Sequence, residues 1–382
     1  MNNKNERSSL ASERKDPTIT KKPIFHGVVY DVGLNFNGDA LSVEIFDPKL
    51  VEYDIKTIAN RLHANAIRIE GEVIERLVAA SRIAHKQGLS VLFNPWKMNA
   101  EADELKSYYI ESAKEAEKLR LEGVDIIFVA GCEYTIFQQG ILPGKTLNER
   151  LVSVGAIFEE GMEKVPEKMQ PLSAQINEIL SECVVGIRNE FNGRVSYAAL
   201  AFEQIDWSIF DIVGIDHYRT SETAEQYVKH FNSYRVHNKP VFCMEVGSCT
   251  YEGAAKLGAG GFMILQGVNP DGSIIFKDDI TPKRSEREQA DYIETQVTLL
   301  ANNEADGIFV YVFSFPVFPH NETEVNKDLD LVSFSLVKAF PSSDPRSKEI
   351  PPWAPKESFQ RLAGLYSQVK TSVKIAHNKS LK

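Results

Sequence analysis

Hydrophobic and polar positions follow two rhythms along this chain. Short runs of β-branched and aromatic residues, bounded by glycine, proline and polar residues, predict strands. Longer segments in which apolar residues recur every three or four positions predict amphipathic helices. The strands are expected at residues 25–30, 66–69, 90–94, 125–131, 195–201, 212–216, 241–244 and 307–314.

The predicted helices follow the strands in turn. They are expected at residues 48–62, 73–87, 102–122, 147–164, 172–190, 222–237, 286–303 and 357–374. A proline-containing turn at residues 165–171 is expected between the fourth and the fifth helix. Strands and helices that alternate in this way are typical of a parallel α/β fold. Eight strands, each followed by a helix or a segment of helix length, favour a single (β/α)8 TIM barrel over an open sheet.

The domain boundaries follow from where the pattern starts and stops. Residues 1–22 are polar and lack an apolar signal segment, so a disordered N-terminal tail is expected there. The barrel is expected to occupy residues 23–376 as one catalytic domain, with a C-terminal tail at 377–382. The proline-rich stretch 315–355 is expected to form a long loop over the barrel mouth, and loops of that length usually have a function.

Composition and charge argue against several classes of function. The chain has 382 residues and a formal net charge of -10, with the acidic residues spread along it. Binding to nucleic acid or to an anionic membrane needs clustered lysine and arginine, so neither is expected. No stretch approaches the roughly 18 apolar residues of a membrane span. The spacing of Cys132, Cys183, Cys243 and Cys249 fits no zinc site and no redox pair, which predicts free buried thiols and a cytoplasmic protein.

Two glutamates at predicted strand ends are the strongest candidates for catalysis. In a TIM barrel the active site lies where the strands end, and Glu133 and Glu245 each follow an apolar strand there. Partial burial raises the pKa of a carboxyl group and suits it to act as a general acid. Two such groups can flank a glycosidic bond, with retention of configuration at about 5 Å separation and inversion at about 6.5–9.5 Å.

Other polar and aromatic residues also lie at predicted strand ends. They could bind a hydroxylated substrate by hydrogen bonding or by stacking on a sugar ring. The substrate-binding candidates are Asp31, Arg68, Asn94, Trp96, Tyr134, His217 and Tyr218. Tyr251 and Phe315, near the same end of the barrel, are further candidates for stacking.

Four short motifs, in order along the chain, resemble clan A glycoside hydrolases, and most of all the cellulase-type barrels of family five. They are NAIRI with Arg68, GCEY with Glu133, GIDHY with His217 and Tyr218, and PVFCMEVG with Glu245. The resemblance covers residues 25–315. It implies that Glu133 is the acid/base and Glu245 the nucleophile of a retaining glycoside hydrolase or transglycosidase. It also implies that Arg68 and Tyr218 support Glu245, while Asp31, Asn94, Trp96 and His217 line a sugar subsite. No metal or organic cofactor is required.

The chain departs from the clan A pattern at two positions. Cys132 stands before the acid/base glutamate, where clan A usually has an asparagine that binds the sugar 2-hydroxyl. The segment YVFSF stands at the eighth strand in place of the usual tryptophan. Finer features, VVYDVG, FVAGCEYTIFQQGILPG and TYEGAAKLGAGG, are similar to a bacterial group whose members carry the label "abortive infection protein".

Two other functions fit the same pattern. The glycine-rich run GAAKLGAGG after the seventh strand could hold a phosphate, as barrel loops there often do, which would suit a lyase, aldolase or isomerase of a phosphorylated metabolite. This alternative predicts an anion beside residues 258–261. A catalytically degenerate barrel could instead bind a sugar or a protein partner, for example in phage defence. That alternative predicts that Glu133 and Glu245 are too far apart, or that one points away from the site.

Overall fold

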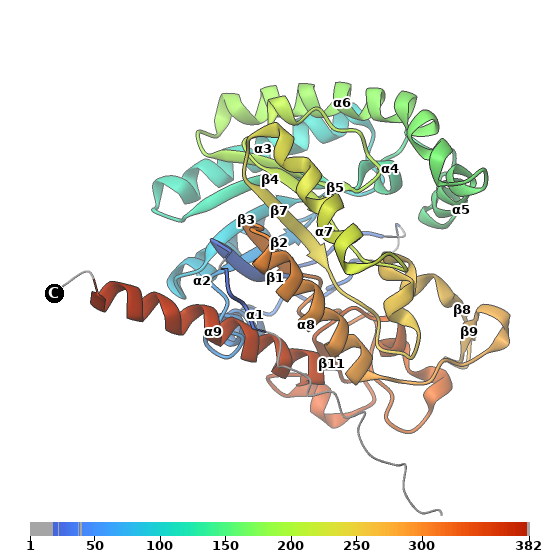
Figure 1. Ribbon diagram of the computed structural model, residues 1–382. Helices are drawn as coiled ribbons and strands as arrows, with labels where there is room; N and C mark the ends of the chain where they lie inside the picture. Colours follow the sequence, from blue (N-terminus) through green and yellow to red (C-terminus); the bar gives the residue numbers. More distant parts are fainter. Residues whose placement is uncertain (1–17, 22, 37, 39, 380–382) are drawn as a thin grey trace, which may run out of the picture.

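The computed structural model describes residues 18–379, except residues 22, 37 and 39, and its core is a closed parallel barrel (Figure 1). The barrel strands are β1 (Phe25–Asp31), β2 (Ala66–Gly71), β3 (Ser90–Pro95), β4 (Ile126–Cys132), β5 (Arg194–Leu200), β6 (Val213–Asp216), β7 (Val241–Val246) and β10 (Gly307–Val310). Around the barrel they are ordered β1-β10-β7-β6-β5-β4-β3-β2. The predicted (β/α)8 barrel is therefore confirmed.

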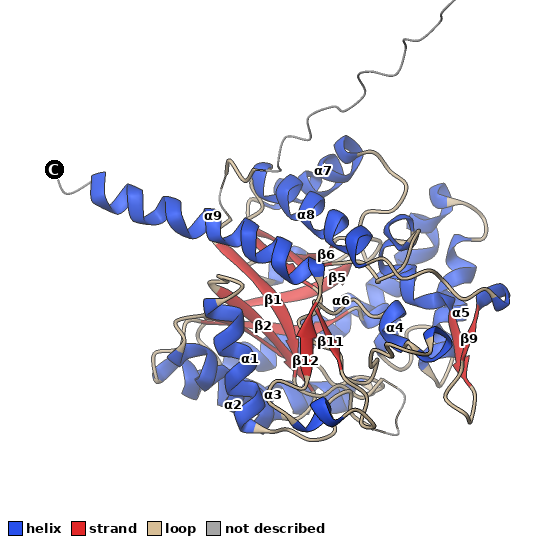
Figure 2. Cartoon of the chain, turned by 90° about the horizontal axis from the view of Figure 1, so that it is seen from below, coloured by secondary structure: helices blue, strands red, loops and turns tan. Residues whose placement is uncertain are grey.

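Helices surround the strands on the outside of the barrel (Figure 2). They are α1 (Pro48–Asn60), α2 (Ile74–Lys86), α3 (Ala102–Leu121), α6 (Val165–Glu190), α7 (Ala224–Ser233), α8 (Glu286–Asn302) and α9 (Glu357–Lys379), with α4 (Tyr134–Phe137) and α5 (Leu147–Phe158) between β4 and α6. Alternate strand residues point outward to these helices and inward to a second cluster that includes Val29, Leu92, Val129 and Phe309. The interior is thus a packed core with its polar residues near the carboxyl ends of the strands.

One predicted interruption is absent from the structure. The turn expected at residues 165–171 is instead the first part of the continuous helix α6, with Pro171 inside it. A proline there removes one backbone hydrogen bond. The apolar face of the helix, with Met169, Ile176 and Leu180 fully buried, compensates for that loss by packing against the body of the protein.

Two small hairpins lie outside the barrel and were not predicted. The first pairs β8 (Leu265–Val268) with β9 (Ile274–Phe276), and the second pairs β11 (Val337–Ala339) with β12 (Trp353–Pro355). The sequence NPDG between β8 and β9 is a recognisable turn signal. The stretch 315–355 therefore contains β11, β12 and several short 3-10 turns.

The ends of several elements differ from the prediction. The eighth barrel strand ends at Val310 and not at residue 314, and a cis peptide bond joins Tyr311 to Val312. Helix α9 continues to Lys379, past the predicted end at residue 374. Most of the predicted N-terminal tail, and residues 380–382 of the C-terminal one, lie outside the described residues. Within the described part of the chain, no helix has the length and apolar character needed to cross a membrane.

Two β-bulges interrupt the barrel just before the two candidate glutamates. The pairing of β4 with β5 shifts register between Val129 and Cys132, and the pairing of β7 with both neighbours shifts next to Glu245. A bulge adds one residue to a strand and so reverses which later side chains point inward. Gly131 occupies the first bulge with φ +80°, and a Cβ there would lie 2.4 Å from the Tyr109 hydroxyl.

Candidate active site at the carboxyl end of the barrel

Glu245 is held through its carboxylate. Its side chain is 7% exposed, and Arg68 Nη1 donates a hydrogen bond to Oε1 at 2.9 Å. The Tyr218 hydroxyl donates to the other oxygen, Oε2, also at 2.9 Å. Donors on separate oxygens fix the orientation of the carboxylate and stabilise its negative charge. The two residues that the resemblance places beside the predicted nucleophile are thus in contact with it.

Arg68 is itself fixed by neutral groups. It is fully buried, its Nε donates to Asn94 Oδ1 at 2.8 Å, and its Nη1 also donates to the Met244 carbonyl at 3.1 Å. The Asn94 amide in turn donates to the Val129 carbonyl at 3.3 Å. Asn94, predicted to bind substrate, is therefore fully buried and oriented toward Arg68 and the barrel wall.

Around Glu245, three carboxyl groups lie near a single arginine among the described residues. Besides the Glu245 contact, Arg68 lies 3.4 Å from Glu70 Oε2 and 3.8 Å from Asp216 Oδ1, and both of these carboxyl groups are buried. Neither Glu70 oxygen has a hydrogen-bond partner among the described residues. Burial raises the pKa of Glu70 and of Asp216 well above the usual range, against the lowering effect of Arg68. Sequence analysis gave neither residue a role.

Glu133 is held through its backbone. It has left-handed dihedrals, φ 46° and ψ 55°, a conformation that costs a residue other than glycine about 1–2 kcal/mol. Its N–H donates to the Ala198 carbonyl of β5 at 2.9 Å, and its own carbonyl accepts from Phe137 N at 3.0 Å. No hydrogen bond to its carboxylate is found among the described residues, and the side chain is half-buried. The Glu133 carboxylate is therefore free to meet a ligand.

The surroundings of Glu133 favour its protonated form. Burial raises the pKa of Glu133 well above its usual range, and the negative charges of Asp216, Glu245 and Glu203 raise it further. A carboxyl group whose pKa is raised in this way is suited to donate a proton. The site therefore combines a hydrogen-bonded carboxyl group at Glu245 with one at Glu133 that has no hydrogen-bond partner among the described residues.

Cys132 contacts the same cluster. Its Sγ lies 3.3 Å from Asp216 Oδ2 and 3.8 Å from Glu245 Oε1. Burial raises the pKa of the thiol well above its usual range, so Cys132 is neutral and a poor nucleophile. The bulge in β4 is what turns this side chain into the barrel interior.

Asp31 and Trp96 also reach the inner end of the site. Asp31 pairs in register with Glu70, and its Oδ1 accepts from Gly33 N at 2.7 Å. Burial raises the pKa of Asp31 to about 6. Trp96 is 2% exposed, and its indole N–H lacks a hydrogen-bond partner among the described residues.

Two predicted substrate contacts point away from the site, and the structure corrects them. Tyr134 is fully buried on the outside of the barrel, where its hydroxyl bonds that of Tyr109 at 2.9 Å. His217 stacks on Tyr227 at 4.1 Å and bonds the Tyr227 carbonyl at 3.0 Å. Burial lowers the pKa of His217 to about 4, so its ring is neutral at physiological pH. Both residues follow an inward-pointing neighbour and therefore face the helices.

An aromatic row borders the mouth of the barrel. Successive ring centroids lie 4.9–6.1 Å apart, and the rings are edge-on to one another. In order, the row is Trp96, Phe137, Phe36, Phe315 and Phe318. The four phenylalanines are half-buried, so part of each ring is open to a ligand. Tyr311, missed by sequence analysis, is also half-buried there, and the charges of Glu70 and Glu245 raise its pKa beyond the effect of burial.

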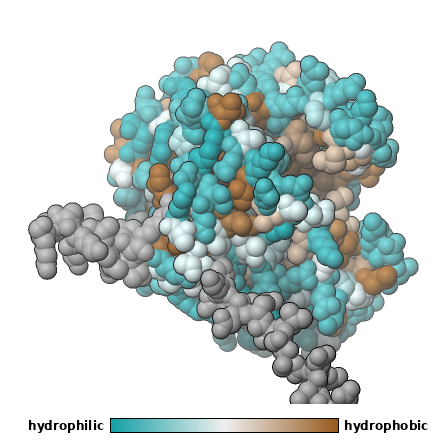
Figure 3. All heavy atoms as spheres, in the orientation of Figure 1, coloured by the Kyte–Doolittle hydropathy of each residue, from teal (hydrophilic) through white to brown (hydrophobic). Residues whose placement is uncertain are grey.

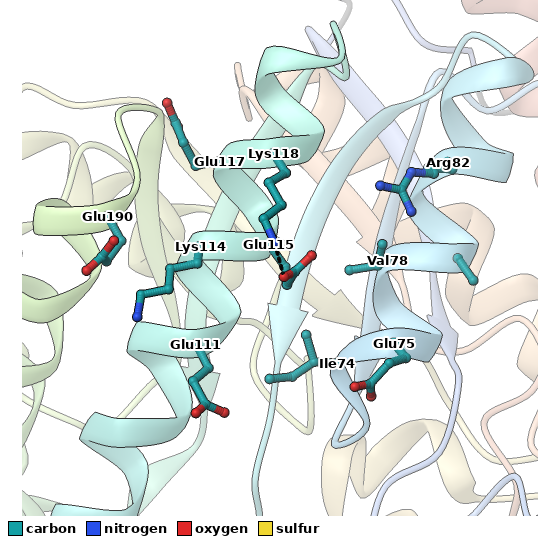
Figure 4. Close-up of a pocket in the computed structure, with 11 residues that line it drawn as sticks. Ile74, Glu75, Val78, Arg82, Glu111, Lys114, Glu115, Glu117, Lys118 and Glu190 are labelled. Atoms are coloured by element: carbon teal, nitrogen blue, oxygen red, sulfur yellow. Dashed lines mark hydrogen bonds and ion pairs between the residues drawn. The ribbon is translucent and has the colours of Figure 1, made fainter.

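The surface is hollowed beside these loops. In Figure 3 the hollow lies on the right, between the part of the molecule that contains α4 and α5 and the part that contains the β8–β9 hairpin, and apolar residues line it. This is the end of the barrel where the strands finish. A second groove of about 840 Å³ lies elsewhere, on the outer surface between α2 and α3 (Figure 4). Among its charged residues, Lys118 pairs with Glu115 at 2.6 Å, and the groove contains neither candidate glutamate.

The glycine-rich run is built differently from a phosphate loop. It contains the 3-10 helices Ala254–Lys256 and Gly258–Ile264, and the amides of Gly253 and Ala255 donate to the Glu288 carboxylate at 2.9–3.2 Å. A carboxylate of the protein thus takes the place next to these amides that an anion would need. Gly261 packs against Cys249, and the Tyr251 hydroxyl donates to its carbonyl at 2.7 Å. Tyr251 is thereby buried and is not a stacking surface.

Two groups of side chains bring potential metal ligands within 4.8 Å of one another. They are Cys132 with Asp216 and Glu245, and His320 with Asp328 and Asp330. Arg68 already pairs with the first group, and Arg284 and Lys356 pair with the second at 2.7–3.0 Å. A cation would have to compete with a resident positive side chain in either place, so the donor sets do not favour a metal.

Solved structures share this architecture. No family model and no curated protein sequence matches the chain. A GH113 β-mannanase from Alicyclobacillus acidocaldarius, solved in complex with ManMIm, matches with a TM-score of 0.53 at 13% identity, over 91% of this chain and 98% of that one. The β-glycosidase BGL167 matches with a TM-score of 0.52 at 12% identity, over 90% and 96% of the two chains.

The class of protein that these comparisons define is the (β/α)8 barrel, a fold that this chain shares with solved glycosidases. Each match spans nearly the whole of both chains, so the barrel and its surrounding helices are shared and not merely a fragment. At this level of identity the likeness establishes the fold alone. The predicted resemblance to glycoside hydrolase barrels is confirmed to that extent.

Proposed function

We propose that the protein is a retaining glycoside hydrolase or transglycosidase. The observation that supports this most directly is the asymmetry of the two glutamates. Glu245 has one donor on each oxygen, from Arg68 and Tyr218, whereas Glu133 has a free carboxyl group whose pKa is raised by burial and by neighbouring charge. A retaining glycosidase needs these two states, an oriented anion and a proton donor.

The reaction would run in two steps. Glu245 attacks the anomeric carbon and forms a glycosyl ester while the Glu133 proton passes to the departing oxygen. The ionised Glu133 then takes a proton from water, or from an acceptor hydroxyl, as that oxygen attacks the anomeric carbon and the bond from this carbon to Glu245 breaks. Arg68 and Tyr218 stabilise the Glu245 carboxylate before attack and as it leaves.

The substrate class is a glycan with accessible C–H ring faces. The aromatic row from Trp96 to Phe318 offers apolar ring surface next to Glu133, since Phe137 lies one helical turn beyond it. Solved structures with the same fold include a β-mannanase and a β-glucosidase. β-Mannosides and β-glucosides are therefore the first substrates to test.

The test is intact-protein mass spectrometry with 2-deoxy-2-fluoro glycosyl fluorides of both sugars. These reagents form the glycosyl ester and hydrolyse slowly, so the native protein should gain the mass of one sugar. Glu245→Gln should gain none, and peptide mapping should place the label on Glu245.

Glu286→Gln is the matched control. The Glu286 carboxylate also has several partners, including Arg284 and Lys338, but it lies outside the candidate site. It should label like the native chain. Absence of an adduct over a broad panel of sugars would refute retention and favour a barrel that only binds its ligand.

A further inference from the structure

We propose that Glu203 is a positioning residue for Glu133. It holds the turn from which the Glu133 side chain projects, and its negative charge acts on the Glu133 carboxyl group. The inference rests on the proposed function, in which Glu133 is the acid/base. Sequence analysis gave Glu203 no role.

The Glu203 carboxylate accepts four hydrogen bonds. Thr135 donates its backbone N–H and its hydroxyl to Oε1, at 2.9 and 2.7 Å. The Tyr197 hydroxyl and the Leu200 N–H donate to Oε2, at 3.0 and 3.1 Å. The side chain is 5% exposed, so these bonds are shielded from water. One carboxylate thus ties the residues just after Glu133 to the end of β5.

Tyr197 connects these hydrogen bonds to Tyr134, the residue that directly follows Glu133. Its hydroxyl accepts the Tyr134 N–H at 2.7 Å while it donates to Glu203. The two amides that follow Glu133 are therefore both satisfied, one directly and one through Tyr197. Helix α4 has only four residues and cannot stiffen this turn by itself. The left-handed backbone of Glu133 is thus maintained from β5.

The charge of Glu203 has no basic partner among the described residues. Burial raises the pKa of Glu203 itself, whereas the hydrogen bonds from Thr135, Tyr197 and Leu200 lower it and so favour the ionised carboxylate. Its negative charge adds to those of Asp216 and Glu245 in raising the pKa of Glu133, while Arg68 lowers it. Cys132 and Tyr218 are the other titratable groups nearby, and burial raises the pKa of both, so they are neutral. Glu203 therefore favours the protonated form that the first step requires, in addition to fixing its place.

The variant Glu203→Gln tests both parts. It has nearly the same size, but it removes the charge, and its NH₂ group cannot accept the bonds that one carboxylate oxygen accepts. The Glu133 carboxyl carbon would be followed by NMR in ¹³C-glutamate-labelled protein, with Glu133→Gln used to assign the signal. The Glu133 pKa should fall in Glu203→Gln and stay unchanged in the matched control Glu286→Gln.

Kinetics supply the second readout. Methyl glycosides need protonation of the leaving oxygen, whereas 2,4-dinitrophenyl glycosides do not. For the sugar that forms the adduct, Glu203→Gln should lower kcat/KM for the methyl glycoside by about 10²-fold and change that for the dinitrophenyl glycoside little. Tyr197→Phe, which keeps the charge, should show a smaller selective loss with the Glu133 pKa nearly unchanged.

The outcomes are separable. An unchanged Glu133 pKa, or an equal loss on both substrates, would overturn the inference and leave Glu203 a purely structural residue. If Glu203→Gln fails to fold, Tyr197→Phe decides, and an equal loss on both substrates there has the same meaning. If the native chain forms no glycosyl adduct, the proposed function fails, and the NMR comparison alone decides whether Glu203 acts on Glu133.

Discussion

The two halves of the candidate site are built in opposite ways. On the β4–β5 side, neutral donors and a single carboxylate fix the backbone around Glu133 and leave its side chain free. On the β2–β7 side, Arg68 and Tyr218 donate hydrogen bonds to the Glu245 side chain itself. Two further buried carboxyl groups, of Glu70 and Asp216, lie near Arg68. In its proposed role as proton donor, Glu133 has to release and regain its proton, so a free carboxyl group on a rigid backbone suits it. In its proposed role as nucleophile, Glu245 has to present one oxygen in a fixed direction, so hydrogen bonds to the carboxylate itself suit it.

The largest expected effect comes from removing Arg68, the basic residue that contacts the Glu245 carboxylate. Arg68→Met would leave three buried carboxyl groups without a counter-ion, which should lower the free energy of unfolding by about 3–5 kcal/mol. Urea unfolding measures this. The matched control is Arg82→Met, which breaks an exposed pair with Glu122 and should cost less than about 1 kcal/mol. Equal effects of the two variants would show that the cluster does not depend on Arg68.

The next largest effect concerns the turn on the Glu133 side. Gly131→Ala places a Cβ at φ +80° against Tyr109 and Tyr134, and it should cost about 1–3 kcal/mol of stability along with most activity. Gly88→Ala is the control, since Gly88 has φ +74° but open space around its Cβ position. It should cost about 1 kcal/mol at most and leave activity intact. A Gly131→Ala protein as active as Gly88→Ala would show that the bulge geometry is not needed.

A smaller effect should separate Tyr218 from Tyr134, which sequence analysis both named as substrate-binding candidates. Tyr218→Phe removes one hydrogen bond to Glu245 and should lower kcat by about tenfold or more, since bonds to charged groups contribute about 1.5–3 kcal/mol. Tyr134→Phe removes only the bond to Tyr109, and it should lower stability by about 1 kcal/mol without changing kcat. Steady-state kinetics and urea unfolding of the pair check this. A loss of kcat in Tyr134→Phe would contradict its outward placement.

The smallest effect is a pH dependence of stability. The folded-state pKa of Glu70 is raised above its unfolded value, so the folded state holds the proton longer and loses stability as pH rises above about 4. Glu70→Gln cannot titrate, and neither Glu70 oxygen has a hydrogen bond to lose among the described residues. The variant should match the native chain near pH 4 and exceed its stability by about 1 kcal/mol at pH 8. A stability loss at pH 8 in urea unfolding would instead show that the Glu70 charge is needed there.

Sequence patterns predicted the barrel well because its signals are local. Each strand is an apolar run and most helices carry a clear amphipathic period, so all eight barrel strands were expected close to their observed places. The failure at α6 has a tertiary cause, since burial of Met169, Ile176 and Leu180 outweighs the bond that Pro171 removes. The β8–β9 hairpin was missed although its NPDG turn is a local signal.

The candidate site was harder to predict because it depends on the direction in which side chains point. Strand ends were found, but Tyr134 and His217 lie one residue beyond inward-pointing neighbours and so face the helices. The two bulges change which residues point inward, and no residue type announces them apart from Gly131. The bonds to Glu203 and the surplus of acid around Arg68 join residues far apart in sequence, so a single sequence cannot show them.

The bulge in β4 also bears on how this site tolerates insertion and deletion. With one residue fewer between Phe128 and Glu133, β4 would have no extra residue to place opposite β5, so the bulge, and the backbone geometry that leads into Glu133, would be lost. The number of residues in FVAGCE is thus constrained more tightly than the identity of several of them. Related chains should therefore be sought by a fixed spacing from the strand to the glutamate, with the residue at the cysteine position allowed to vary.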